Sequence, residues 1–431
     1  MLDLLYILAS LVAWPWVLLM LILSARWRRG LGERLGGVPA RGGDRRCLWV
    51  HGASVGEVLL AKGFIAGWRK AHPDWDVAVS TVTPTGQDVA KKNFGELPVF
   101  FWPLDFSPCV RRTLDRIRPD AVVLVELEVW PNFVKTCAAR GIPVVVVNGR
   151  ISERSAPRYA KLGFMRRAFS RVTRFCAQEE AYAARARALG FAPERVSVTG
   201  NMKFDGLPEA PSPEAKAALA AKLGIAPDAR VLVGGSTHDP EEKHLLCAFR
   251  GLQAAHPGLR LVLVPRHPER GGDVARDAAD AGFAVIRKTQ IDGGAKPPPD
   301  AVVVVDTVGE LRTLWGLATV AFVGGSLTTR GGQNIMEPAA MGRPVVFGPH
   351  MENFREASAL LLAADGCLQI SGPDALLPAL AGLLGDDASA GALGERARAS
   401  LTGMAGATAR NLASIEEVLT TAPKPGSLIR P

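Results

Sequence analysis

Short apolar runs rich in β-branched residues alternate with longer amphipathic stretches over most of this chain, and this alternation constrains its fold more than any other feature. A first series comprises Leu48–His51, Val77–Val82, Val99–Trp102, Ala121–Glu126, Pro143–Asn148, Phe175–Gln178 and Val196–Thr199. A second series comprises Val231–Gly234, Leu259–Pro265, Ala284–Arg287, Val302–Asp306, Val320–Gly324 and Pro344–Phe347. Such runs are typical of buried parallel strands joined by crossover helices. The chain is therefore predicted to be an α/β protein with two Rossmann-like, doubly wound domains that face each other across a cleft.

The proline-rich segment 207–213 separates the two series and is predicted to be a linker. It divides an N-terminal domain, 26–206, from a C-terminal domain, 214–404. The chain of 431 residues is long enough for two such cores. Segment 405–431 is expected to form a helix that packs back on the body, with helix-compatible spacing at Ala409, Leu412, Ile415 and Leu419, and a loose tail from Pro423.

Residues 1–25 differ from the rest because Leu4–Leu23 is an uncharged, almost wholly apolar run. A helix of about 20 residues spans a hydrocarbon core of about 30 Å, so this segment is predicted to be a membrane anchor. Pro15 can kink such a helix, which leaves a shallow or re-entrant insertion open. Arginines follow the run, at 26, 28, 29 and 34, and under the positive-inside rule they are expected to place the remaining chain in the cytoplasm.

The formal charge of +9 suits an anionic partner, but the basic residues are scattered and lack interleaved aromatic residues. We therefore expect no nucleic acid and favour an anionic membrane surface, with solvated arginine-rich faces as the alternative. The six cysteines form no Cys-x-x-Cys pair, so we expect reduced thiols and no disulfide. Asp74 and Asp76 resemble a metal-binding pair, but they precede a predicted strand and lie at the wrong sheet edge. We expect no metal site and no obligate protein partner.

A glycine-rich stretch between Val323 and Gly348 has the order strand, loop, helix start and strand. Glycines let a backbone approach a ligand closely, and the first N–H groups of a helix favour a phosphate. The loop Gly324–Ser326 is thus a candidate phosphate loop, and Glu337, about one turn into the helix, is placed to hold a ribose. A second small loop contributes Ser236 and Thr237. The alternative is a purely structural βα turn.

Candidate catalytic groups in the first domain follow its predicted strands. Glu57 lies after the first of them, where a carboxylate facing an open cleft can act as a general base. The alternative role of Glu57 is charge complementarity in the first turn of a helix. Glu126 and Glu128 end another strand, and alternation points both to one side, for transition-state stabilisation or for an arginine salt bridge. Lys203 can neutralise an anion or simply be solvated, and His51 is expected to be structural.

In the second domain, Arg266 ends a predicted strand and suits a phosphate or carboxylate. The segment Asp306–Leu311 begins at the end of the predicted strand Val302–Asp306. Since parallel strands end at one edge of a sheet, these segments and the helix near Asn334 are expected to converge on one pocket.

Taken in order, these motifs resemble the 3-deoxy-D-manno-octulosonic acid (Kdo) transferases of lipopolysaccharide assembly. The resemblance extends from the N-terminal run to about Phe354 and rests on His51–Glu57, Glu126–Asn132, Gly200–Asp205, Pro265–Arg270, Gly309–Leu311 and Gly324–Glu337. It implies a glycosyltransferase-B fold, a CMP-Kdo donor, a lipid A precursor (lipid IVA) as acceptor, and inversion without a metal or other cofactor. A UDP-sugar enzyme of the same fold and a non-catalytic nucleotide-binding module are the competing hypotheses.

The resemblance also implies individual roles. Glu57 becomes the proton acceptor, and Glu126 and Lys203 become transition-state stabilisers. The implied CMP contacts are Pro265, Arg266, Val308, Gly309, Glu310, Asn334, Ile335, Met336 and Glu337. The loop residues Ser236, Thr237, Gly324, Gly325 and Ser326 remain a possible donor or phosphate site.

Overall fold

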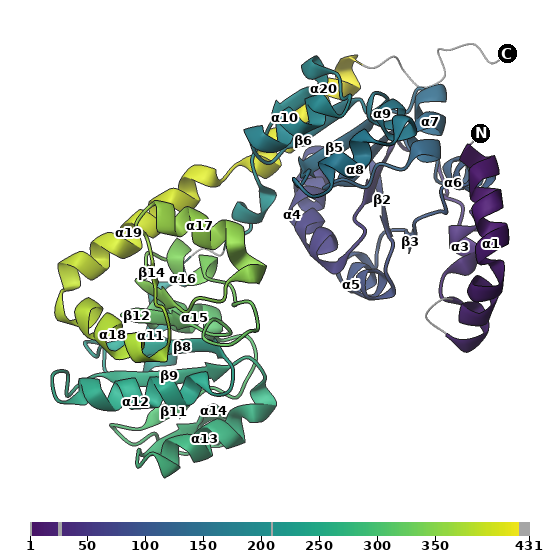
Figure 1. The fold of residues 1–431 in the computed structure, drawn as a ribbon. Helices are drawn as coiled ribbons and strands as arrows, with labels where there is room; N and C mark the ends of the chain where they lie inside the picture. Colours follow the sequence, from purple (N-terminus) through teal and green to yellow (C-terminus); the bar gives the residue numbers. More distant parts are fainter. Residues whose placement is uncertain (1, 25–27, 208–209, 422–431) are drawn as a thin grey trace. The chain divides into compact units, whose positions relative to one another are not determined.

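The computed structural model describes residues 2–24, 28–207 and 210–421 of the chain, apart from some side chains within the first helix. These residues form two compact units (Figure 1). The first unit comprises Met1–Gly206 together with Met404–Pro431, and the second comprises Leu207–Gly403. The predicted linker, 207–213, falls at the start of the second unit and lies partly outside the described residues.

The first unit is built on a parallel sheet of seven strands in the order β3-β2-β1-β4-β5-β6-β7. All seven strands of the first predicted series are confirmed, with ends displaced by a single residue. They are β1 Cys47–His51, β2 Asp76–Thr81, β3 Val99–Phe101, β4 Ala121–Val125, β5 Val144–Gly149, β6 Arg174–Ala177 and β7 Val196–Val198.

Helices cover both faces of this sheet, because successive strand residues point to opposite faces and both sets are apolar. Trp49 packs on one side with helices α6 Ser107–Ile117, α7 Pro131–Ala139 and α9 Gly163–Phe169. Its neighbours Leu48 and Val50 pack on the other side with α4 Val55–Ala71, α5 Pro84–Phe94 and α20 Ala407–Thr421. The remaining α-helices of this unit are α1 Leu2–Leu23, α3 Leu31–Arg34, α8 Ala156–Ala160 and α10 Glu180–Ala188.

The second unit repeats the design with a parallel sheet in the order β10-β11-β9-β8-β12-β13-β14. Its strands are β8 Val231–Thr237, β9 Arg260–Pro265, β10 Val285–Arg287, β11 Val302–Val304, β12 Val320–Val323, β13 Val345–Phe347 and β14 Leu368–Gln369. The second predicted series is confirmed, but β14 was not predicted because two residues carry no readable alternation. The α-helices are α11 Pro213–Lys222, α12 Glu241–Gln253, α13 Gly271–Asp280, α14 Lys288–Asp292, α15 Leu311–Leu317, α16 Met336–Ala340, α17 Arg355–Ala363, α18 Leu376–Gly385 and α19 Asp387–Met404.

The C-terminal helix α20 returns to the first unit, where it lies in yellow among the teal and blue elements of that unit (Figure 1). Its buried residues are Ala407, Asn411, Ile415 and Val418. Of the residues noted for their spacing, Ile415 is buried, Leu412 and Leu419 are partly buried against the core, and Ala409 is exposed. Asn411 can be buried because its Nδ2 donates to the Ala407 carbonyl at 2.8 Å. The predicted tail from 423 onward lies outside the described residues.

The N-terminal segment forms helix α1, but the structure does not support the predicted membrane anchor. Among residues 2–24, 28–207 and 210–421, no helix combines the length and apolarity needed to cross a membrane. Polar contacts instead tie the start of α1 to the first unit. Asp3 Oδ1 accepts from the Ser107 N–H at 3.0 Å, and the Tyr6 hydroxyl donates to Asp105 Oδ2 at 3.2 Å. Hydropathy along the chain does not register such long-range contacts.

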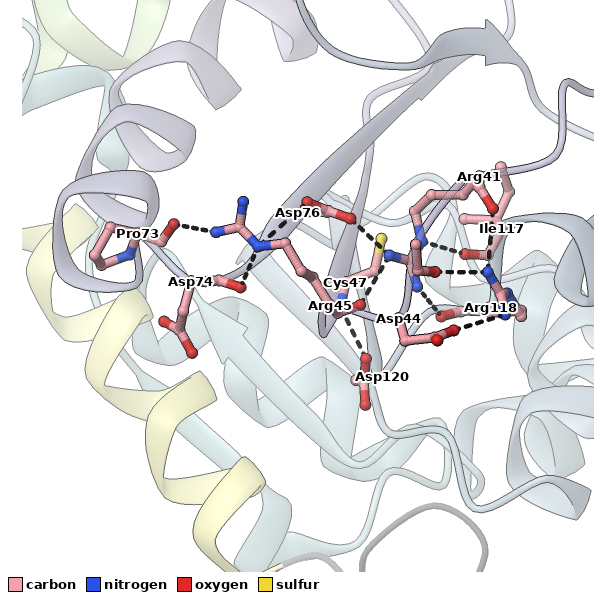
Figure 2. Close-up of polar contacts among 11 residues, drawn as sticks. Arg41, Asp44, Arg45, Cys47, Pro73, Asp74, Asp76, Ile117, Arg118 and Asp120 are labelled. Atoms are coloured by element: carbon pink, nitrogen blue, oxygen red, sulfur yellow. Dashed lines mark hydrogen bonds and ion pairs between the residues drawn. The ribbon is translucent and has the colours of Figure 1, made fainter.

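An arginine network holds the amino-terminal edge of the first sheet (Figure 2). Arg41 Nη1 lies 2.6 Å from Asp76 Oδ2, and Arg41 Nε donates to the Ile117 carbonyl at 2.9 Å. Arg45 Nε donates to the Asp74 carbonyl at 2.9 Å. The Asp76 carboxylate is therefore engaged with arginine, at the edge opposite to the strand ends that carry the candidate catalytic groups.

Candidate active site

Glu57 is held at the start of α4 by the turn that follows β1. Ser54 is the N-cap residue, and its Oγ accepts from the Glu57 N–H at 3.4 Å. In return, Glu57 Oε1 accepts from the Ser54 hydroxyl at 2.9 Å, and Glu57 Oε2 accepts from the Ala53 N–H at 2.7 Å. This reciprocal arrangement resembles a capping box. Both predicted readings of Glu57 are thus compatible, since the cap fixes the carboxylate and leaves it partly exposed.

Glu57 has the pKa expected of a group that exchanges protons near neutrality. Burial raises the pKa of Glu57 to about 7, because it disfavours the charged form. Its two hydrogen bonds oppose this shift, and the negative charges of Glu126 and Glu128 add to it. The structure therefore brings three strand-end carboxylates, Glu57, Glu126 and Glu128, close enough to interact.

The geometry of Glu126 differs from the predicted one. Strand β4 ends at Val125, and Glu126 has a left-handed backbone with φ of 63°. Strand alternation therefore does not place its carboxylate. A non-glycine residue in this region is strained, which is common at functional sites. Glu128 accepts from the Trp130 indole N–H at 3.1 Å, and its pKa is raised by burial and by Glu126.

His51 is structural, as predicted. Its side chain is fully buried, with Nδ1 2.9 Å from Ser80 Oγ, and its ring lies 3.9 Å from the Trp102 ring. Burial lowers the pKa of His51 to about 3, so the imidazole is neutral and does not titrate at working pH.

Lys203 is exposed on a 3-10 turn, η2 Met202–Phe204, whose other two residues are buried. The turn is anchored by Asn148, whose Oδ1 accepts from the Met202 N–H at 2.8 Å. Asn148 is the penultimate residue of β5 and has a φ of 53°, and its buried Nδ2 has no hydrogen-bond partner in the described protein. Asn148 was not among the predicted site residues. The signal was a polar residue that ends a run of valines in a predicted buried strand.

In the second unit, Arg266 follows β9 with an exposed side chain, and its N–H donates to the Thr237 carbonyl at 2.9 Å. Ser236 has a left-handed backbone with φ of 53°. The Thr237 hydroxyl is buried and donates to Glu242 Oε1 at 2.9 Å, and Arg270 Nη1 binds the same oxygen at 2.8 Å. Thr237 is thus part of an internal network, whereas Arg266 is accessible to a ligand.

The glycine loop after β12 does bind an anion, but the anion belongs to the chain. Glu241 is fully buried in the first turn of α12, and its carboxylate accepts from the backbone N–H groups of Gly325, Ser326 and Leu327 at 2.7–2.9 Å. A fourth bond, at 2.9 Å, comes from the His238 N–H. A phosphate could reach the loop N–H groups only by displacing this carboxylate. Glu241 was not among the predicted site residues, because its partners in the glycine loop begin 84 residues further along the chain.

The segment after β11 holds its glutamate through a buried lysine. Glu310 Oε1 lies 2.9 Å from Lys288 Nζ, and Lys288 is 2% exposed. Burial alone would lower the pKa of Lys288, but its bonds to Asp292 and Glu310 raise it, so the ammonium stays charged. Val308 is 86% exposed and Gly309 has a φ of 104°. An apolar side chain this exposed at a strand end is available to a ligand surface.

The helix predicted near Asn334 starts later than expected. Helix α16 begins at Met336, so Glu337 lies in its first turn and not a turn further in. Asn334 orients this start, because its Oδ1 accepts from the Met336 N–H at 3.1 Å and its Nδ2 donates to Glu337 Oε1 at 3.0 Å. Ile335 is buried and Pro265 ends β9, which limits both to backbone contacts with any ligand.

The chain is similar in sequence to known proteins of one family. A family model described as 3-deoxy-D-manno-octulosonic-acid transferase (Kdo transferase) matches residues 29–206. The 3-deoxy-D-manno-octulosonic acid transferase of Haemophilus influenzae is 33% identical over 390 residues, which covers 87% of this chain and 88% of the relative. That of Bordetella pertussis is 33% identical over 418 residues, covering 91% and 95%. The chain belongs to the Kdo transferase family. It is accordingly a glycosyltransferase of lipopolysaccharide synthesis.

The fold agrees with this membership. A crystal structure of a glycosyltransferase from Rickettsia africae is 12% identical with a TM-score of 0.55, covering 88% of this chain and all of that chain. At this identity the likeness concerns the fold alone. It supports the predicted α/β class with two parallel sheets and a glycosyltransferase-B-like organisation.

Among the residues that the structure describes, no group of three or more histidines, cysteines, aspartates or glutamates is arranged to hold a metal ion. The prediction of a metal-independent reaction remains a prediction.

Proposed function

We propose that this Kdo transferase moves Kdo from CMP-Kdo to a hydroxyl of a lipid A precursor, with inversion at the sugar and without a metal. The donor carries a phosphate and a carboxylate on the reacting carbon, so the enzyme must tolerate negative charge while a cationic centre develops. Both kinds of group are available in the chain. Arg266 and Lys203 are exposed cations, and Glu126 is a strand-end carboxylate.

In this mechanism Glu57 removes the proton from the acceptor hydroxyl. The oxygen then forms a bond to the anomeric carbon of Kdo, while the bond from that carbon to the phosphate oxygen breaks and CMP leaves with the electron pair. Glu126 stabilises the cationic centre, and Lys203 and Arg266 stabilise the departing negative charge. Val308–Glu310 and Asn334–Glu337 supply the remaining proposed contacts to CMP.

The observation that carries this proposal is the state of Glu57. A pKa of about 7 lets the carboxylate accept a proton in a step that requires one to be removed, and general bases are most effective when their pKa lies near the operating pH. The cap formed by Ser54 and Ala53 orients both oxygens before the acceptor binds.

We also propose that the enzyme works at the cytoplasmic face of the inner membrane. Large apolar side chains on α1 are exposed at the spacing of one helical face, among them Leu4, Ile7, Leu8 and Leu11. An exposed apolar stripe of this kind suits the plane of a membrane interface. Replacing Leu4, Leu8 and Leu11 by Gln should release the protein from sedimenting anionic vesicles. Unchanged sedimentation would remove α1 from the proposed contact.

The function is tested directly by incubating the protein with CMP-Kdo and lipid IVA and weighing the lipid product by mass spectrometry. A gain of whole Kdo units is expected. Calorimetric titration with CMP and with UMP provides the second arm, in which CMP should bind more tightly. Equal or tighter binding of UMP, with no mass gain from CMP-Kdo, would contradict the proposal and favour a UDP-sugar enzyme.

A further inference from the structure

Two cavities in the first unit share wall residues, the first of them is also lined by Glu128 of the carboxylate cluster, and neither is used by the mechanism above. The first, of about 240 Å³, is lined mainly by apolar side chains, including Val129, Phe164, Met165 and Phe169. Glu128 lines the same cavity. An apolar cavity of this size beside the cluster is suited to part of an extended ligand, since complete small-molecule sites are typically larger.

The second cavity, of about 160 Å³, has the opposite character. It is lined by Lys135 of α7, by Arg167 of α9 and by Arg171, which follows α9. Lys135 and Arg167 have exposed side chains. Among the described residues of the lining, Asp3 is the one acidic residue, and its Oδ1 already accepts from the Ser107 N–H and from Asn132 Nδ2 at 2.9 Å. Three cations therefore face this cavity against one carboxylate that is already hydrogen-bonded.

The two cavities share two wall residues, Pro131 and Phe164. A single ligand that spans them must be apolar at one end and anionic at the other. Tyr159 and Glu128 line the apolar cavity together. Burial and the Glu128 charge raise the pKa of Tyr159, in agreement with this proximity.

We propose that the paired cavities form the acceptor subsite, in which the apolar cavity takes an acyl chain of the lipid acceptor and Lys135 and Arg167 bind its phosphate. This inference rests on the proposed function for the identity of the acceptor. It adds that α7, α9 and the start of α1 supply the residues that contact the acceptor. Selection of a phosphorylated, acylated sugar then comes from one continuous surface that ends at Glu128.

Binding is tested first with dihexanoyl phosphatidic acid, a short-chain lipid phosphate used below its micelle concentration. Titration into the full-length protein, followed by calorimetry, should show it binding at least tenfold tighter than glycerol 3-phosphate, which lacks the chains, and than dihexanoyl phosphatidylcholine, which lacks the net negative charge. Equal affinity for glycerol 3-phosphate would overturn the acyl-chain half of the proposal. Equal affinity for the choline lipid would overturn the phosphate half.

Arg167→Gln should weaken the binding of dihexanoyl phosphatidic acid about tenfold, because a charge-assisted hydrogen bond to phosphate is lost. Arg166→Gln is the matched control. Arg166 is the exposed neighbour of Arg167 on α9 and lines neither cavity, so its loss should leave affinity unchanged. Equal weakening in both variants would indicate general electrostatic attraction and contradict the subsite. A variant that loses vesicle binding but keeps monomeric lipid binding would assign Arg167 to the membrane surface instead.

Steady-state kinetics then connect the subsite to transfer. In Arg167→Gln the KM for lipid IVA should rise about tenfold, while kcat and the KM for CMP-Kdo stay unchanged. If the wild-type enzyme transfers Kdo but Arg167→Gln has the wild-type KM for lipid IVA, the subsite proposal is wrong and the proposed function is unaffected. Arg167-dependent lipid binding without any Kdo transfer would defeat the function and leave the lipid site standing.

Discussion

Each unit places a glutamate in the first turn of the helix that follows a central strand of its sheet. The two glutamates differ in their hydrogen bonds and in their exposure. Glu57 follows β1 and accepts two hydrogen bonds, from a hydroxyl and a backbone N–H. Glu241 follows β8 and accepts four hydrogen bonds from backbone N–H groups. Glu57 is partly exposed and Glu241 is fully buried.

The difference teaches how one local motif serves two purposes. Burial raises the pKa of both carboxyls. For Glu241 four N–H donors oppose that effect, and protonation would deprive some of them of an acceptor. For Glu57 the donors are fewer, and the neighbouring charges of Glu126 and Glu128 favour a bound proton. Two features thus distinguish a carboxylate that exchanges protons from one that holds a loop in place. They are the number of hydrogen-bond donors to the carboxylate and the sign of the neighbouring charges.

The largest effect is expected from Glu57→Gln, which keeps the size of the side chain and removes the proton acceptor. Turnover should fall by about 10²–10⁴, the usual contribution of a positioned general base, while CMP affinity stays nearly unchanged. Single-turnover kinetics and CMP calorimetry measure the two quantities. If Glu57→Gln keeps near-normal turnover while Glu126→Gln or Glu128→Gln abolishes it, the base lies in the strand-end pair.

Glu241→Ala should act on stability and not on proton transfer. It leaves four backbone N–H groups without their acceptor, and each buried unsatisfied group costs about 1–3 kcal/mol, so we expect a loss of about 3–5 kcal/mol after local relaxation. Urea unfolding, followed on the transition of the second unit, measures the loss. Glu214→Ala is the control, since Glu214 lies in the first turn of α11 but is exposed, and its removal should leave the midpoint nearly unchanged. Equal midpoints for both variants would refute the structural role of Glu241.

Arg266→Ala tests the assignment of donor binding to the second unit. Loss of a charge-assisted hydrogen bond to the phosphate should weaken CMP binding by about 1.5–3 kcal/mol. Calorimetry measures this change, and the pH dependence of turnover should remain that of the wild type. Unaltered CMP affinity would remove Arg266 from the site.

The pH dependence of kcat/KM sharpens the contrast further. A general base acts in its unprotonated form, so the rate should rise about tenfold per pH unit below the pKa of Glu57, about 7, and level off above it. Glu57→Gln should flatten this limb in its residual activity, whereas Arg266→Ala should not. A wild-type profile without a limb near pH 7 would show that another group limits the reaction.

Much of the fold was predictable from the sequence, because strand periodicity and helix caps are local properties of the chain. The strands of both sheets follow from runs of β-branched residues, and the turn around Ser54 and Glu57 follows from a four-residue pattern. Strand β14 was not predicted because two residues are too few to show the alternation of a strand. Glu126 departed from strand alternation because its backbone turns left-handed beyond the end of β4.

The sequence by itself determined which segments become strands and which polar residues stand at their ends, since those choices depend on neighbours within a few positions. Only the tertiary structure decided how these residues interact. It gathered Glu57, Glu126 and Glu128 from two strand ends, and it inserted Glu241 into a loop far along the chain. It also tied Asp3 to the first unit. The physical reason is that pKa values and internal ligation depend on burial and on charges brought together by folding, which no local pattern encodes.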